Sequence, residues 1–219
     1  MKALFVLAFA LAGGRILTAQ TPEAKEALAK SIVIQQALRS SDGLHKAALA
    51  KGGRFATIDN LLPRNRSGSI EQLVYRSNEI FEGTVISSKA ALADNGRELV
   101  TVFTLQVQKI LSGSSTAIVQ VAVPGGIFRF ADGSQVVSES PKIKRPLLKH
   151  RYLVFCTADQ EVKGQFRLAA SDESTFELDA QHRAFSHASD PTNGLHKVAA
   201  NGESALISEV QAVIAKSKK

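Results

Sequence analysis

The sequence predicts a mainly β protein, built as a small antiparallel barrel or sandwich with helices before and after it. Three observations favour this fold class. Between residues 79 and 178, apolar residues recur at every second position, as in strands that bury one face. Turn-forming residues interrupt that pattern at short intervals. Helical spacing of apolar residues is confined to the segments before and after this region.

The chain begins with a segment typical of a secretory signal peptide, residues 1–19. Met1-Lys2 supplies a basic start, Ala3–Ala12 an apolar core and Ala19 a small residue at the expected cleavage site. The apolar run is shorter than the about 20 residues that a membrane-spanning helix needs. We therefore expect export to the periplasm or secretion, with no transmembrane segment in the mature chain.

Residues 20–68 are predicted to form a helical arm and a linker. Thr21-Pro22-Glu23 favours a helix start, because Thr caps the helix, Pro fits its first position and Glu lies in its first turn. Ser40–Gly43 ends this helix, and a second short helix precedes Gly52-Gly53. The arm has few large apolar residues, so we expect loose docking. The linker is expected over 54–68, which has no periodicity.

Residues 69–180 are predicted to form the β domain. Ser69–Gln72 is a capping box that opens a short helix ending at Ser77. Tyr152–Cys156 is apolar throughout, which indicates a strand covered on both faces. The predicted strands are Ile80–Ser88, Leu99–Leu111, Ile118–Val123, a hairpin around Asp132-Gly133, Tyr152–Cys156, Gln165–Ala169 and Thr175–Leu178.

Residues 181–219 are predicted to form a polar, irregular segment and then an amphipathic helix near 202–216. The apolar stripe of this helix consists of Leu206, Ile207, Val210, Val213 and Ile214. We expect the stripe to pack against the barrel. Docking of this helix into a partner's groove is the alternative.

The net charge and the aromatic content of the chain limit the classes of partner that we expect it to bind. Loss of the signal peptide removes Lys2 and Arg15 from a chain of net charge +7, so the mature chain stays basic. A basic exported protein favours anionic envelope polymers, anionic lipid surfaces or acidic proteins, although positive charge also serves solubility alone. With no Trp and two Tyr, the chain offers few rings for stacking bases, which argues against a nucleic-acid partner.

Four structural motifs follow one another through the β domain: Ile70–Val85, Thr101–Gly113, Val123–Gly126 and Arg151–Phe155. Their order resembles uncharacterised exported bacterial proteins with an OB-like barrel of the netrin and tissue-inhibitor type. The resemblance covers about half the chain, implies an OB-like barrel and names no catalytic group. The chain departs from the pattern at Lys149-His150-Arg151, where similar chains have a Gly-Glu-like entry. It also lacks the cysteine bridges of the tissue inhibitors, so their inhibitory mechanism does not carry over.

Three histidines are the candidate metal ligands. His182, His187 and His196 lie close in sequence, within a segment (179–203) that also carries carboxylates. Imidazole and carboxylate ligands can hold zinc. The spacing matches no established zinc motif, and ordinary loop histidines are the alternative.

No catalytic residue is identified. Cys156 would need a neighbouring base and an accessible, electropositive setting to act as a nucleophile. It ends the most apolar predicted strand, which favours a buried hydrophobic role. As the only cysteine it also excludes a disulfide within the chain. The Gly-x-Ser-x-Gly motif of serine hydrolases is absent, and Gly113-Ser114-Ser115 is explained by a turn.

A basic segment is the candidate binding site. It contains Lys142, Lys144, Arg145, Lys149 and Arg151 with no acid between them. On a barrel rim such a segment would bind carboxylates or phosphates, and OB-like barrels bind ligands across one face. The alternative is a solvated loop whose charges protect the following apolar strand from aggregation.

Two functional hypotheses follow. The first is an exported, non-enzymatic binding or interaction module without a cofactor, which contacts a protein or an anionic envelope polymer through the basic segment. The second is a metal-dependent or other hydrolase that uses the histidines and carboxylates of 179–203. The lack of a recognisable catalytic motif favours the first.

Overall fold

The computed structural model describes residues 42–58, 66–93, 96, 98–139, 144–159 and 164–217. The predicted signal peptide and the first predicted helix lie outside these residues. The helices are α2 (Gly43–Ala50), α3 (Ile70–Arg76), α4 (Gly194–Ala200) and α5 (Glu203–Ser217), with a 3-10 turn, η1, at Ser171–Ser174. The strands are β1 (Arg54–Ile58), β2 (Glu79–Leu92), β3 (Leu99–Ser112), β4 (Ile118–Pro124), β5 (Gly126–Arg129), β6 (Gln135–Glu139), β7 (Arg151–Ala158), β8 (Gln165–Leu168), β9 (Thr175–Leu178) and β10 (Ala184–Ser186).

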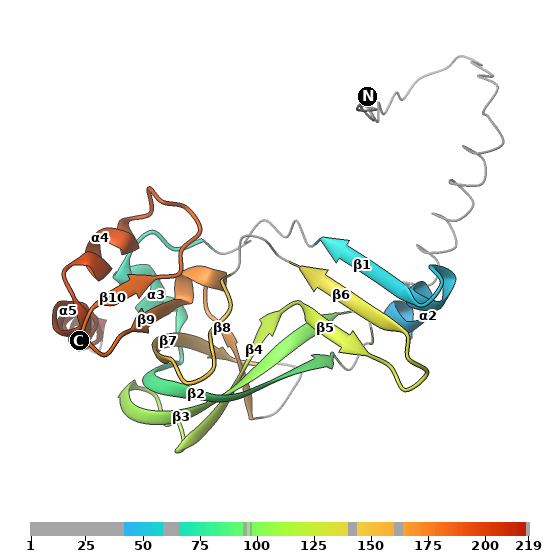
Figure 1. Ribbon diagram of the computed structural model, residues 1–219. Helices are drawn as coiled ribbons and strands as arrows, with labels where there is room; N and C mark the ends of the chain where they lie inside the picture. Colours follow the sequence, from blue (N-terminus) through green and yellow to red (C-terminus); the bar gives the residue numbers. More distant parts are fainter. Residues whose placement is uncertain are drawn as a thin grey trace, which may run out of the picture.

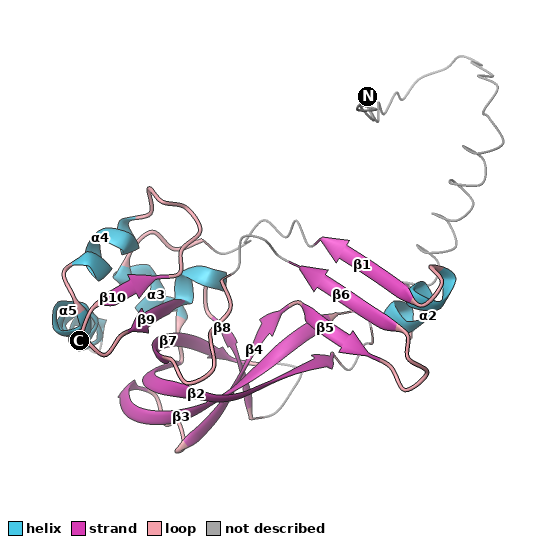
Figure 2. Ribbon diagram, in the orientation of Figure 1, coloured by secondary structure: helices cyan, strands magenta, loops and turns pink. Residues whose placement is uncertain are grey.

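The strands β2, β3, β4, β8 and β7 pair in a closed ring, which confirms the predicted mainly β fold with a barrel (Figures 1 and 2). β2 pairs antiparallel with β3 and β7, and β3 pairs antiparallel with β4. β8 closes the ring by pairing antiparallel with β7 and parallel with β4. The β4–β8 pairing departs from the antiparallel arrangement predicted, because alternation along a strand reports burial and not the direction of its neighbour.

β7 is buried on both faces, as its apolar sequence predicts. Tyr152, Val154 and Cys156 point into the barrel, whereas Leu153 and Phe155 face the layer formed by α3, α4 and α5. The barrel cluster consists of Phe81, Val85, Phe103, Leu105, Val119, Val121, Val123, Tyr152, Val154 and Cys156. One strand therefore joins the two main parts of the core.

The C-terminal helix packs on the outer face of the barrel sheet. Leu206, Val210 and Ile214 of α5 are buried in the same cluster as Ile70 and Leu73 of α3. This arrangement confirms that the apolar stripe serves the core, so it does not offer an open face to a partner. Among the described residues, no helix is long and apolar enough to cross a membrane.

A second, three-stranded sheet lies on the opposite side of the barrel from α5 (Figure 1). The predicted hairpin is present as β5 and β6. The linker prediction is wrong at its start, because 54–58 form β1, which pairs in parallel with β6. Loose docking is also wrong for α2, because Leu44 and Ala48 are buried against this sheet. The partners of α2 and β1 are distant in sequence, so local periodicity could not identify them.

The segment predicted to be irregular, 181–200, contains two short elements. β10 pairs with β9 and extends the barrel sheet by one strand. Asn193 caps the N-terminus of α4, and its side chain accepts a hydrogen bond from the backbone N–H of Leu195. Leu195 and Ala199 are then buried in the helix-covered part of the core. Two buried apolar residues within a polar segment are too few to give a recognisable helical periodicity.

Candidate functional site

The described part of the basic segment forms a loop, residues 144–150, that is hydrogen-bonded to its neighbours and leads into β7. The hydroxyl of the buried Tyr152 accepts a hydrogen bond from the Leu147 N–H at 2.9 Å. Lys149 N–H donates to the Val85 carbonyl at 2.8 Å, and Val85 N–H donates to the His150 carbonyl at 3.1 Å. Lys149 adopts a φ of 67°, a left-handed conformation that costs energy in a residue other than Gly. The loop therefore has a conformation fixed by its neighbours.

Two of the predicted binding cations instead make contacts within the protein. Arg151 forms an ion pair with Glu203 at the start of α5, with Nη2 and Oε2 separated by 2.5 Å. Arg145 donates to the Ser138 carbonyl at 3.1 Å. Both contacts hold the loop and β7 against neighbouring elements, so these side chains are structural. Lys142 lies outside the described residues.

Lys144 and Lys149 are the two predicted cations that remain exposed. Within the described parts of the chain, neither ammonium group forms an ion pair with a carboxylate. The nearby carboxylates are already engaged: Glu177 contacts His150 at 2.7 Å, and Glu203 contacts Arg151. The rim of the barrel therefore presents two exposed lysine side chains, while Glu177 and Glu203 contact other residues of the chain.

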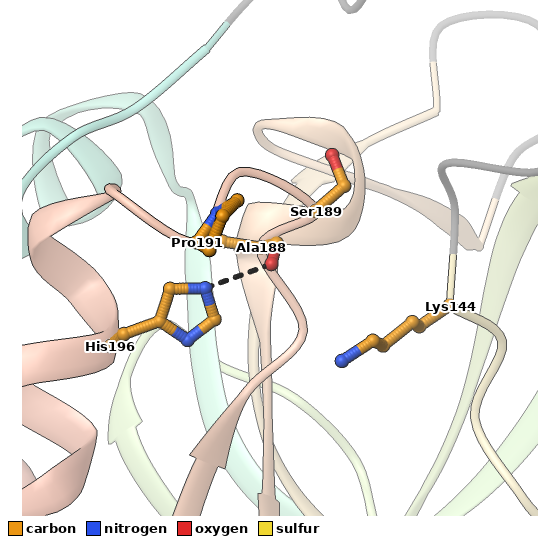
Figure 3. A pocket seen from close by; sticks show the side chains of 5 residues that line it. All are labelled: Lys144, Ala188, Ser189, Pro191 and His196. Atoms are coloured by element: carbon orange, nitrogen blue, oxygen red, sulfur yellow. Dashed lines mark hydrogen bonds between the residues drawn. The ribbon is translucent and has the colours of Figure 1, made fainter.

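Lys144 also lines a shallow pocket of about 320 Å³. Figure 3 shows its side chain on one side of this hollow and the His196 imidazole on the other. His196 Nε2 hydrogen-bonds the Ala188 carbonyl at 3.0 Å, which fixes the ring. Ser189 and Pro191 complete the wall.

The three histidines predicted as alternative metal ligands have separate partners. His182 contacts Glu203 at 3.1 Å, His187 contacts Glu177 at 3.6 Å, and His196 binds a backbone carbonyl. Throughout the described ranges, no group of three His, Cys, Asp or Glu side chains is placed to hold a metal ion. The structure therefore does not bring these three residues together as one centre.

His187 is the most buried of these histidines. Its ring packs edge-on against Tyr152, with 5.4 Å between the ring centroids. Burial lowers the pKa of His187, and the neighbouring Glu177 only partly opposes that effect. A neutral imidazole in this position is part of the packing beneath the loop.

Cys156 lies fully buried inside the barrel. Burial raises the pKa of its thiol, and the carboxylate of Glu79 adds to that rise. A protonated thiol enclosed by apolar side chains is a poor nucleophile. This position agrees with the hydrophobic role that the sequence predicts.

The sequence analysis missed the exposed aliphatic side chains on and near the loop. Leu147 and Leu148 at the loop tip are 54% and 53% exposed, and Ile86, next to the anchoring Val85, is 49% exposed. The adjacent leucines after Pro146 were a visible signal. These leucines do not belong to a strand or helix pattern, so periodicity gave no indication of where their side chains lie.

No protein family model matches the chain, and no curated protein matches it either.

Proposed function

We propose that this protein is an exported, non-enzymatic binding module that contacts an anionic partner through the rim loop, residues 144–151. One observation carries the proposal. Lys144 and Lys149 are exposed and have no carboxylate partner among the described residues, because Glu177 and Glu203 contact His150 and Arg151 instead. Cations left free on a rigid surface are available to an external anion.

The fixed backbone of the loop supports a binding role. The hydrogen bonds of Leu147, Lys149 and His150 hold the tip against β2 and Tyr152. A preorganised surface loses less conformational entropy when a partner binds. A loop that served only to shield β7 from aggregation would need the charges but not this constrained conformation.

The hydrolase hypothesis receives less support from the same residues. The contacts of His182, His187 and His196 are separate, and Cys156 is enclosed by the barrel core. A nucleophile and its base must lie within hydrogen-bond reach. The binding module is therefore the function that we propose.

A pull-down tests this function. The mature chain, residues 20–219, is used as bait for native envelope and culture-medium extracts, with washes at low salt and near 1 M salt, where the screening length falls to about 3 Å. We expect retention that the variant Lys144→Gln/Lys149→Gln loses. The control Lys51→Gln/Lys216→Gln removes the same charge from two other exposed lysines. Equal retention by all three proteins would contradict the proposal.

A further inference from the structure

We infer that the partner of the rim loop is an anionic lipid bilayer, into which Leu147 and Leu148 insert while Lys144 and Lys149 contact lipid phosphates. This inference rests on the proposed function and names its partner. It combines two features of one loop: exposed leucines at the tip, and, on either side of it, lysines that form no ion pair with any described residue.

The apolar tip is held in the exposed position. The Leu147 N–H is bound by the buried Tyr152 hydroxyl, and the next residues are bound to Val85 on β2. The two leucines therefore stay exposed while the surrounding backbone is fixed. Two leucines held exposed at a loop tip are available for insertion into an apolar phase such as the interface of a bilayer.

The charges around the tip complement an anionic surface. From residue 144 to 151 the sequence Lys-Arg-Pro-Leu-Leu-Lys-His-Arg has no acid. Basic residues that flank apolar ones are the composition by which peripheral proteins bind anionic bilayers, with the apolar groups in the interface and the cations at the phosphates. A bilayer without anionic lipids would accommodate the leucines but would offer no net negative charge to the lysines.

The size of the apolar surface favours a bilayer over a protein groove. Leu147 and Leu148, each half exposed, present an apolar area on the order of 200 Å². A specific protein interface covers about 800 Å² on each partner. A bilayer needs no complementary shape, so a small apolar tip with flanking cations is sufficient for peripheral binding.

Vesicle co-sedimentation tests the lipid partner. We expect the mature chain to bind vesicles of equal parts phosphatidylcholine and phosphatidylglycerol, and not vesicles of phosphatidylcholine alone. Leu147→Ser/Leu148→Ser should weaken binding about fivefold for each leucine, and Lys144→Gln/Lys149→Gln about fivefold for each lysine. The control Leu49→Ser/Tyr75→Ser removes two exposed apolar side chains from α2 and α3 and should bind normally.

A fluorescence measurement tests insertion directly. The chain has no Trp, so Leu148→Trp places a single reporter at the loop tip. Its emission should shift to the blue when mixed vesicles are added. Tyr75→Trp, at a position that is 90% exposed on α3, should show no shift. Vesicle binding without a shift at residue 148 would overturn insertion of the leucines. Unchanged thermal melting of each variant ensures that lost binding is not lost folding.

The two proposals fail in different ways. Absence of binding to mixed vesicles, with retention in the pull-down that still depends on Lys144 and Lys149, overturns the lipid partner and leaves the binding module. A protein retained near 1 M salt through Leu147 and Leu148 also overturns the lipid partner. Retention and vesicle binding that are both insensitive to the lysines overturn both proposals.

Discussion

The replacement Arg151→Gln separates a structural cation from the binding cations of the same loop. Arg151 and Glu203 form an ion pair whose side chains are 27% and 10% exposed. Removal of one partner from a buried pair costs about 3–5 kcal/mol, because the other charge is left uncompensated. Solvent reaches part of this pair and His182 also contacts Glu203, so we expect a loss of about 2 kcal/mol in the free energy of unfolding.

Thermal unfolding followed by circular dichroism measures this effect. A chain of this size loses about 2–4 °C in Tm for each kcal/mol, so Arg151→Gln should melt about 4–8 °C lower. Glu203→Gln should have a similar effect, and the double variant should lose less than the sum of the two. Lys149→Gln is the matched control and should melt like the wild type, because its side chain is exposed. The reasoning is refuted if Arg151→Gln melts within 1 °C of the wild type.

Three further predictions concern the buried polar groups. Glu79→Ala should lower the free energy of unfolding in urea by about 2 kcal/mol, because the carboxylate accepts hydrogen bonds from Ser114 and Ser115. The stability should fall as the pH drops below 6.5, because burial lowers the pKa of His187 and the unfolded chain then binds more protons; His187→Phe should flatten this dependence in pH-resolved melts. Cys156 should react with a thiol reagent only after unfolding, because burial raises its pKa.

Each of these predictions has an outcome that contradicts it. Normal stability of Glu79→Ala would mean that solvent replaces the lost carboxylate at the β3–β4 turn. An unchanged pH dependence in His187→Phe would assign the acid sensitivity to other groups. Rapid labelling of the native Cys156 thiol would show that the barrel opens under native conditions.

The predicted β region agrees with the structure because its strands are long enough to show a repeating pattern of apolar and polar residues. The alternation along Leu99–Leu111 gives the buried inner face of β3, with Phe103 and Leu105 in the barrel cluster. The apolar run Tyr152–Cys156 is buried on both sides. β1 and β10 were missed, because short strands at the margin of a sheet carry too few buried residues to give a pattern.

In the candidate site, too, the sequence predicted some features and could not predict others. Sequence reasoning located the basic loop, because five cations without an acid are visible along the chain. It could not assign separate roles to them. Arg151 is neutralised by Glu203, which lies 52 positions further along the chain, whereas Lys149 has no acid within reach among the described residues. Contacts between distant residues decide which charges remain free.

The sequence by itself determined a mainly β barrel domain, a buried β7, a packed C-terminal helix and a basic loop. Each of these follows from the period or composition of one continuous segment. Only the tertiary structure decided the parallel closure of β4 on β8, the pairing of β1 with β6 and the split between structural and free cations. The physical reason is that periodicity records which face of a segment is buried. Strand partners and ion pairs depend on groups that only folding brings together.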